Sequence, residues 1–305
     1  MKIIKESKSL GKLTIKEIDY HTAKKITLEN HYSKKWNTSF GKLNFGIFRN
    51  NKLLGVAVFG NLMNPKSYKQ YGDFLKKENV LELNRMWISD ELGKNSETIL
   101  ISSSLKIIKQ EHPNVKIIQT FADGRLGVGT IYKASNFDYL GYHKTLFFEN
   151  VETGEVYHNV PMSNTKRPKG MIKLNALFLQ GKLKPMMVKT YKYIYVLDKK
   201  TRKNIDIKTL SYPKYEKGFD YLDDYKVPPS LVARFALMVK NLNKDYFDLA
   251  KKYMIENYGN FDGYLIEQRE NESYKWFEKE YDLDNLKEFS LDDNKKEQTS
   301  IFDFL

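Results

Sequence analysis

The chain has 305 residues, contains no cysteine and carries a formal net charge of +13. Its length is enough for one large core or two smaller ones, and the absence of cysteine excludes disulfides, thiolate metal sites and a cysteine nucleophile. No apolar stretch has the length of a signal sequence or a membrane span, so we expect a soluble cytoplasmic protein without membrane association.

The charge is unevenly distributed. The segment after Tyr215 has 13 Lys and Arg residues against 20 Asp and Glu residues, whereas the segment before the division has 38 basic and 18 acidic residues. The first segment therefore carries about +20 and the second about −7. Such an excess favours a polyanionic partner, most often nucleic acid, although a lysine-rich composition bias gives the same excess.

Strands and helices alternate in the basic segment, as judged from apolar periodicity and turn residues. The order is typical of a GNAT-like acyltransferase fold, a mixed sheet flanked by helices in the α+β class, and a generic α+β domain also accommodates it. In chain order the predicted elements are a strand over 13–18, a helix over 21–30, a hairpin of strands 43–48 and 53–59, a strand over 81–88, a helix over 96–109, a strand over 115–120, a helix from 130 and a strand over 139–148.

The rest of the chain predicts a loop over 157–169 and a further strand over 187–197. From Pro228 the pattern changes to an amphipathic helical stripe over 231–242, followed by helix to about 258 and another around 274–277. We therefore predict three parts, which are a basic domain over 1–215, an acidic helical appendage over 216–290 and a tail over 291–305.

An acidic residue and a glycine loop follow the strand over 115–120. Asp123 stands before Gly127 and Gly129, and a helix begins near Thr130. Open α/β sheets bind their ligands at the carboxyl ends of strands, which makes Asp123 the first catalytic candidate. The alternative is a turn aspartate that accepts hydrogen bonds from the loop N–H groups.

The loop before the helix at 96 reads Asp90-Glu-Leu-Gly-Lys-Asn-Ser-Glu97. A GNAT-like protein holds the coenzyme A pyrophosphate here, with main-chain N–H groups of an Arg/Gln-x-x-Gly-x-Gly/Ala loop. This loop lacks the second glycine and adds acidic residues. Acetyl-CoA is thus a doubtful donor, and the sequence identifies no other small-molecule donor.

Five segments carry a family resemblance, namely His31-Tyr-Ser33, Leu83-Asn-Arg-Met86, Ala122 to Asn136, Tyr193 to Lys203 and Tyr212-Pro-Lys214. They resemble the Mom family of bacteriophage DNA-modification proteins, and the resemblance covers about residues 20–215. It implies a GNAT-like fold and conversion of adenine in DNA to an N6-carbamoylmethyl derivative, which protects phage DNA from restriction. Iron bound by Asp123, His31 or a tyrosine is compatible with this family, but no histidine–carboxylate spacing requires a metal.

The resemblance suggests a role for each matching side chain. Asp123 would remove the proton from adenine N6, a poor nucleophile whose lone pair is delocalised. Arg85, in mid-strand, would pair with a carboxylate such as Asp123 or bind donor oxygens, with a structural ion pair as the alternative. His31 and Tyr32 would supply a proton, orient the base or join a metal site, with a structural histidine as the alternative. The candidate donor contacts are Gly127, Gly129, Thr130 and Tyr132.

Duplex DNA is the expected partner, and its target adenine would have to leave the base stack. Basic and aromatic residues beside His31 are candidates for holding the DNA, although solvated surface lysines give the same pattern. A core aromatic is the alternative for Tyr132. The candidate DNA contacts are Lys34, Lys35, Trp36 and Lys42.

The tail contains Gln298-Thr-Ser-Ile-Phe302, which resembles the bacterial sliding-clamp-binding motif. The peptide would place Gln298, Ser300, Ile301 and Phe302 on the clamp, unless its apolar residues fold back onto the appendage. The sequence therefore predicts a DNA adenine-modifying transferase tethered to the clamp. An N-acetyltransferase acting on a protein or small molecule, and a non-catalytic DNA- or clamp-binding protein, are the alternatives.

Overall fold

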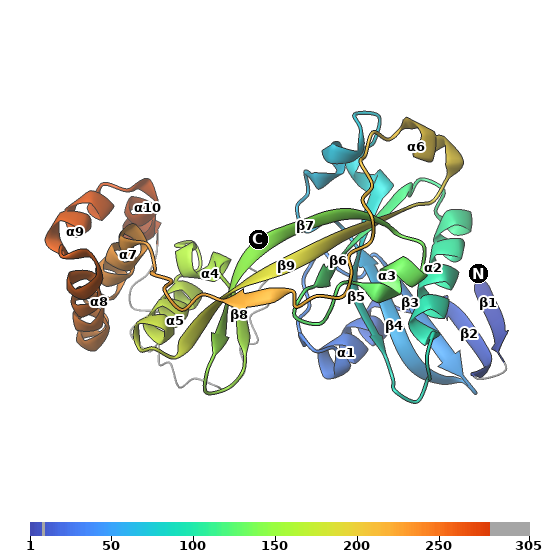
Figure 1. Cartoon of the computed structure of the whole chain (residues 1–305), viewed down its shortest axis with the longest axis horizontal. Helices are drawn as coiled ribbons and strands as arrows, with labels where there is room; N and C mark the ends of the chain where they lie inside the picture. Colours follow the sequence, from blue (N-terminus) through green and yellow to red (C-terminus); the bar gives the residue numbers. More distant parts are fainter. Residues whose placement is uncertain (8–9, 281–305) are drawn as a thin grey trace. The chain divides into compact units, whose positions relative to one another are not determined.

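The structure is a computed structural model that describes residues 1–7 and 10–280. The chain forms two compact units built from alternating segments (Figure 1). Met1–Lys144 and Lys189–Gly218 form unit 1, and Thr145–Val188 joins the described residues from Phe219 onward in unit 2. Two long strands, β7 (Asp138–Asn150) and β9 (Leu183–Val196), contribute residues to both units.

Unit 1 is a mixed sheet with helices. A strand over Lys2–Ser7, which the sequence did not predict, comes first, and the elements after it follow the order predicted for a GNAT-like domain. Its strands follow the order β1-β2-β3-β4-β5-β6-β9-β7, and β5 and β6 run parallel. Besides parts of β7 and β9, the elements are β1 (Lys2–Ser7), β2 (Gly11–Glu17), α1 (Tyr20–Asn30), β3 (Leu43–Arg49), β4 (Lys52–Gly60), the 3₁₀ turns η1 (Ser67–Tyr71) and η2 (Lys77–Asn79), β5 (Val80–Ile88), α2 (Ser96–Glu111), β6 (Ile117–Asp123), α3 (Thr130–Ala134) and α6 (Lys199–Asn204).

Local sequence explains the central hairpin and its covering helices. Asn50 and Asn51 adopt φ values of 50° and 63°, the left-handed pair that a tight hairpin turn requires. The main apolar core joins α2 to alternate residues of the strands, including Phe45, Ala57 and Phe59. Helix α1 contacts β3, β4 and β5, so the sheet carries helices on both faces (Figure 1).

A β-bulge changes which side chains of β5 share a face. Leu83 and Arg85 pair with consecutive residues of β4, which leaves Asn84 as an extra residue. Leu83 and Met86 consequently both pack against the core beneath α2, although they are three residues apart. Glu82 and Arg85 are therefore brought to the opposite face together. Without the bulge, strict alternation would separate them.

Strands β5 and β6 pair over only part of their length. The parallel register joins Val80–Glu82 to Ile117–Gln119. Beyond this point β5 pairs with β4 and β6 pairs with β9. Where the two strands separate, the Thr120 hydroxyl donates a hydrogen bond to the Leu83 carbonyl at 3.1 Å. This separation brings residues from two strand ends into one polar region.

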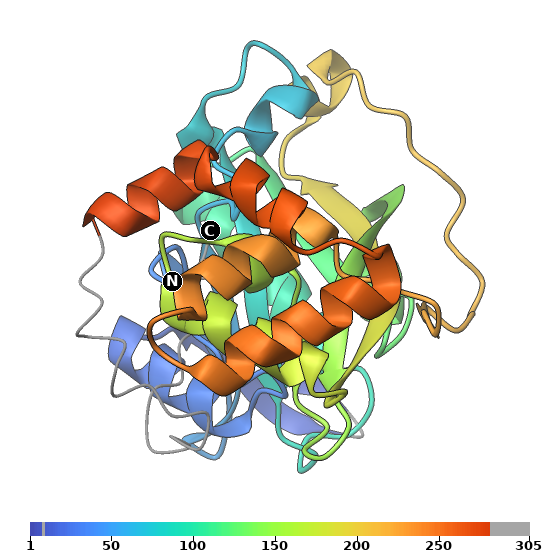
Figure 2. The same cartoon turned by 90° about the vertical axis from the view of Figure 1, so that its left-hand side faces the viewer.

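Unit 2 has its own apolar core, which joins α5, α7, α8, α9 and α10 with residues of β7 and β9. Figure 2 shows the ribbons of the C-terminal helices in the foreground. The helical appendage predicted from the amphipathic stripe is present, whereas much of the loop predicted over 157–169 is regular structure. The elements are β8 (Val156–His158), α4 (Val160–Ser163), α5 (Pro168–Leu179), β10 (Phe219–Tyr221), α7 (Pro229–Val239), α8 (Lys244–Tyr258), α9 (Asp262–Arg269) and α10 (Glu272–Glu280).

Among the residues that the structure describes, no helix is both long and apolar enough to cross a membrane. The segment Thr145–Val188 groups with the C-terminal helices. The predicted division at residue 215 places Thr145–Val188 in the first domain. In the structure, unit 1 consists of the residues before and after this segment.

Two glycines hold the loop after β6. A Cβ atom on Gly124 would lie 2.4 Å from the Lys189 carbonyl oxygen and 2.6 Å from that of Gly218. We expect Gly124→Ala to destabilise the protein by about 1–3 kcal/mol, because rigid backbone would have to move. Urea unfolding measures the effect. Gly93→Ala is the control, since its Cβ would meet only a leucine methyl at 3.4 Å. Equal stability of the two variants would contradict this account.

Candidate functional site

Asp123 is the last residue of β6, and its carboxylate is held by Arg125 two residues later. The Arg125 Nε donates to both carboxylate oxygens at 3.0 and 3.1 Å, and a terminal guanidinium nitrogen donates at 2.5 Å. The Arg125 main-chain N–H also donates to Oδ1 at 3.0 Å. The turn role considered for Asp123 is thus present, together with a two-pronged ion pair that orients the carboxylate.

Arg85 lies on the face of the sheet opposite α2, as the bulge requires. Its guanidinium lies over the Phe40 ring, 4.6 Å from the centroid, and one terminal nitrogen donates to the Asn84 carbonyl at 2.7 Å. Burial lowers the pKa of Arg85, and the hydroxyl of Tyr32 and the carboxyl of Glu82 oppose that shift. The planar guanidinium is therefore held in one orientation beside Tyr32.

His31 ends α1 as its C-cap residue and is 7% exposed. The Ser33 main-chain N–H donates to Nδ1 at 3.1 Å, and the Ser33 hydroxyl lies 2.9 Å from the same atom. The neutral ring therefore carries its proton on Nε2. Burial, and then the positive charge of Arg85, lower the pKa of His31 to about 3. His31 is thus a neutral hydrogen-bond donor at Nε2, not a base that titrates near neutral pH.

The Tyr32 hydroxyl lies within the influence of the charges of the other candidate residues. Its pKa is raised to about 12, first because burial of the hydroxyl disfavours phenolate and second because the Asp123 carboxylate does so. Arg85 and Arg125 act on the same hydroxyl in the opposite direction. Since 59% of the residue surface is exposed, water limits the effect of burial. The structure therefore groups His31, Tyr32, Arg85 and Asp123, and it adds Arg125.

The glycine loop leads from Asp123 into α3. Gly127 and Gly129 have φ values of 136° and 82°, and Gly129 is the N-cap residue of α3. Thr130 is exposed at the helix start. Tyr132 is 9% exposed and packs in the main core, with its ring centroid 5.4 Å from that of Tyr193. The packing role considered for Tyr132 therefore has direct structural support.

The four candidate DNA contacts differ in exposure. Lys34 and Lys42 are exposed, and Lys35 is half-buried. Trp36 is 8% exposed, and its indole N–H donates to the Tyr20 hydroxyl at 2.8 Å. Its ring also packs edge-on against Phe40. Trp36 therefore supports the segment that carries the lysines and does not present its ring to a ligand.

Sequence patterns did not identify Glu82, which is 5% exposed beside Arg85. Gln119 donates to one carboxyl oxygen at 2.7 Å and Asn84 to the other at 3.0 Å. The Tyr71 hydroxyl in turn donates to the Gln119 amide oxygen at 2.7 Å. This network spans β5, β6 and η1, so it fixes the two strands where they separate.

The pKa of Glu82 is raised because burial disfavours the charged form. The folded state therefore binds this proton more tightly than the unfolded state does. Its contribution to stability is present below the ordinary glutamate pKa of 4.5 and is lost as pH rises through the folded-state pKa. We expect the free energy of unfolding of Glu82→Gln to fall less than that of the wild type between pH ~5 and ~8. Urea titrations measure it, and exposed Glu78→Gln should behave like the wild type.

The contacts of Asp123 and His31 give no support to the iron suggested for them. Both oxygens of Asp123 accept hydrogen bonds from Arg125, and Nδ1 of His31 accepts one from the Ser33 N–H. Among the described carboxylates and imidazoles, the group close enough to share a metal is Glu17, Glu111 and His112. Neither Asp123 nor His31 belongs to that group, so we assign no chemical step to iron.

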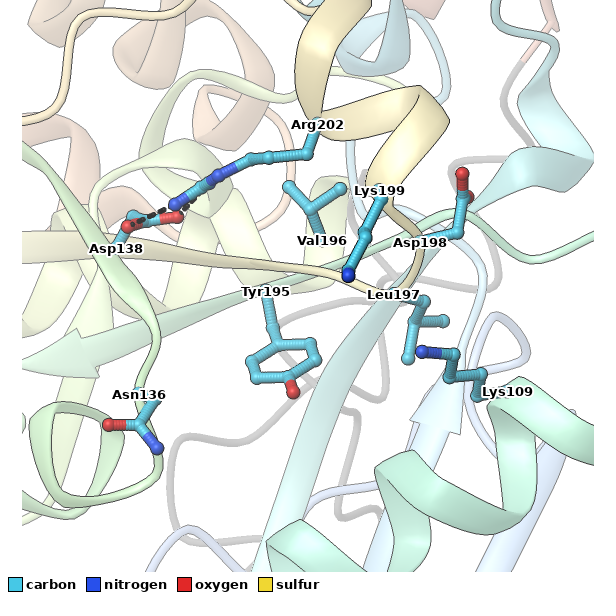
Figure 3. A pocket seen from close by; sticks show the side chains of 9 residues that line it. All are labelled: Lys109, Asn136, Asp138, Tyr195, Val196, Leu197, Asp198, Lys199 and Arg202. Atoms are coloured by element: carbon cyan, nitrogen blue, oxygen red, sulfur yellow. Dashed lines mark hydrogen bonds and ion pairs between the residues drawn. The ribbon is translucent and has the colours of Figure 1, made fainter.

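A separate recess of about 280 Å³ lies at the other end of β6. Figure 3 shows Tyr195 and Lys199 directed into it, beside the ion pair between Arg202 and Asp138. The strand register places this end of β6 beside Val196, whereas Asp123 pairs with Thr190. The recess contains none of the residues predicted for catalysis or donor binding.

The fold and the site define the protein as a GNAT-like α+β domain. Its candidate site combines a carboxylate, a guanidinium, an imidazole and a phenol where two parallel strands separate. The chain belongs to the Mom protein family, whose model matches residues 12–214. It is 35% identical over 210 residues to the methylcarbamoylase Mom of Escherichia phage Mu. The aligned region covers 67% of this chain and 84% of that protein.

Similar solved structures include acetyltransferases. A ribosomal-protein-S5-alanine acetyltransferase from Vibrio fischeri matches 65% of this chain and 98% of its own, with 9% identity and a TM-score of 0.37. An N-acetyltransferase from Staphylococcus aureus matches 61% and 97%, with 13% identity and a TM-score of 0.33. Because these TM-scores are low, the family assignment rests on the sequence matches.

Proposed function

We propose that this protein is a transferase that converts adenine in phage DNA to an N6-carbamoylmethyl or related derivative and so protects the DNA from host restriction. The observation that carries the proposal is the Mom-family match over residues 12–214, which includes every residue of the Asp123 site. The electrostatics support it, because the charges of Asp123 and Arg85 both act on the Tyr32 hydroxyl and that of Arg85 acts on the His31 ring.

The chemistry is the transfer of a carbamoylmethyl group from an activated donor. The N6 lone pair forms a bond to the donor methylene carbon, while the bond from that carbon to the leaving group breaks and the leaving group keeps the electron pair. Asp123 accepts the N6 proton as the new bond forms. Arg125 keeps the carboxylate oriented for that transfer, and Arg85 binds the oxygens of the donor.

His31 and Tyr32 complete the site as neutral groups. The Nε2–H of His31 and the hydroxyl of Tyr32 donate hydrogen bonds to the adenine or to the donor carbonyl. Their pKa shifts keep both groups in this state near neutral pH. Gly127, Gly129 and Thr130 border Asp123 and contact the donor in this proposal. Acetyl-CoA is the alternative donor, although Glu97 lies in the first turn of α2, where it would repel the pyrophosphate of coenzyme A.

The DNA partner is held by exposed basic residues close to His31. Lys34 and Lys42 contact backbone phosphates in this proposal, and Lys35 assists them. The clamp peptide Gln298–Phe302 lies outside the described residues and stays a hypothesis from the sequence. It would bring the enzyme to replicating DNA in the host cytoplasm.

Nucleoside mass spectrometry of plasmid DNA tests the function. Bacteria expressing the full chain should contain an adenine adduct heavier by a carbamoylmethyl group, and cells with an empty vector should not. An adduct heavier by an acetyl group would support acyl transfer instead. DNA without any adduct, recovered from cells with folded protein and a co-expressed set of phage genes, would refute a modifying role. A variant lacking residues 298–305 separates clamp tethering from chemistry.

A further inference from the structure

Phe121 lies two residues before Asp123 on β6, on the face that carries the candidate site. Side chains two residues apart on a strand point the same way, so Phe121 and Asp123 share this face. Lys192 of β9 is the register partner of Phe121 and therefore shares it as well. Phe121 and Lys192 are half-buried and His143 is exposed. An aromatic and basic patch thus adjoins the carboxylate.

The side chains of this patch hold one another in place. The His143 ring stands edge-on to the Phe121 ring, with centroids 6.0 Å apart and planes at 82°. The Lys192 ammonium lies 5.0 Å from the centroid of the Tyr71 ring and donates to the Gln70 side-chain oxygen. Phe121 thus has a heteroaromatic ring in contact with it and, at its register partner, a cation whose position is fixed by Tyr71 and Gln70.

Packing does not account for Phe121. None of the three buried apolar clusters in the described part of the chain includes it. Its neighbour Ala122, on the other face, does belong to the main core. A half-buried phenylalanine on a central strand, two residues from a candidate catalytic carboxylate and on the same face, is instead placed to contact a planar ligand.

The charges around Phe121 suit an uncharged heterocycle. Burial, and then the ammonium of Lys192, lower the pKa of His143, so its ring is neutral near pH ~7 and offers one donor and one acceptor. Burial lowers the pKa of Lys192 to about 8, and Glu82 opposes that shift. Lys192 is therefore mostly protonated at neutral pH and is a hydrogen-bond donor suited to ring nitrogens.

We propose that Phe121, His143 and Lys192 form the seat of the acceptor base, an adenine that has left the base stack. This inference rests on the proposed function and deepens it. The base stacks on Phe121, its edge meets His143, and Lys192 donates to a ring nitrogen. Two strand residues span about 7 Å, roughly the width of a base, so the exocyclic N6 reaches the Asp123 carboxylate.

Binding of single-stranded DNA tests the seat without any donor. Fluorescence anisotropy would compare an oligonucleotide that contains one adenine among abasic sites with an all-abasic strand of equal charge. We expect the wild type to prefer the first strand. Phe121→Leu keeps apolar bulk but removes the stacking face, and should weaken binding of the adenine strand about 5- to 150-fold while leaving the abasic strand unchanged. Phe121→Trp should keep the preference.

Two further variants decide between a base seat and other roles. Phe74→Leu is the control for Phe121→Leu, because Phe74 is 49% exposed and lies between η1 and η2, off the sheet face. Lys192→Gln should reduce the preference without changing the salt dependence, since Lys192 contacts the base. A lower salt slope for Lys192→Gln would place it on a phosphate and overturn its assignment. A preference unchanged in Phe121→Leu would overturn the seat.

These outcomes separate the inference from the proposed function. If the wild type prefers the adenine strand through Phe121 but yields no adduct in cells, the modifying role is refuted and the base-binding role of Phe121 is retained. Conversely, if the adduct forms equally well with Phe121→Leu, the modifying role is retained and the base-binding role of Phe121 is refuted. Circular dichroism melting of each variant shows whether it is folded.

Discussion

Asp123→Asn should reduce the adenine adduct about 10²- to 10⁴-fold, the range that a general base contributes. The amide oxygen can still accept hydrogen bonds from Arg125, so the turn after β6 should persist. It cannot take a proton from N6 at neutral pH, and the proton would have to leave to water. Mass spectrometry of plasmid nucleosides, at matched protein levels, measures the loss.

A second aspartate provides a matched control for that result. Asp138 also binds an arginine through two nitrogens, in this case Arg202, at the recess near the other end of β6. Asp138→Asn removes the same charge from the same kind of pair, yet it should leave adduct formation within about twofold of the wild type. Equal losses in the two variants would mean that Asp123 acts through stability, and the role of base would have to be given up.

Arg85→Lys should reduce adduct formation about 10²- to 10³-fold, comparable with the removal of one preorganised donor from an active site. Lysine keeps the positive charge but has neither the planar face that lies on Phe40 nor the fork that can hold the Asn84 carbonyl and a ligand together. The substitution therefore keeps a positive charge at residue 85 but changes its position and shape. Initial rates of adduct accumulation after induction measure the effect.

The Phe40 ring provides an internal test of the Arg85 result. Phe40→Leu preserves the arginine and removes the flat surface beneath it, so a smaller loss in the same direction is expected. Arg202→Lys is the control for an arginine-to-lysine change in unit 1. If Arg85→Lys retained full activity, the guanidinium would have only a structural role.

Local patterns were sufficient for the elements that lead to the site. The β-branched run before Asp123, the Asn50–Asn51 turn and the apolar periodicity of α2 all depend on neighbours within a few residues, and the structure contains each of them. The glycine loop is likewise local, because Gly127 and Gly129 occupy positions with positive φ. The strand that ends at Asp123 continues past the predicted residue 120, since β9 pairs with it to its end.

Features that depend on distant pairing could not be predicted in the same way. Glu82 was not identified because its burial depends on Gln119 and Tyr71, which approach it only when β5, β6 and η1 assemble. The bulge at Asn84 depends on the register with β4, and it alone puts Arg85 beside Glu82. The pair between Arg125 and Asp123 is an exception, because its spacing of two residues is local and visible in the sequence.

The backbone contact between Gly124 and Gly218 has a consequence for synthesis of the chain. The Gly124 N–H donates to the Lys189 carbonyl, and the Lys189 N–H donates to the Gly218 carbonyl, so three distant positions fix the loop that follows Asp123. A nascent chain must therefore pass residue 218 before this loop is held, long after β6 itself has been made. Contacts this distant in sequence form slowly, so we expect the loop after Asp123 to be fixed later than the strand that precedes it.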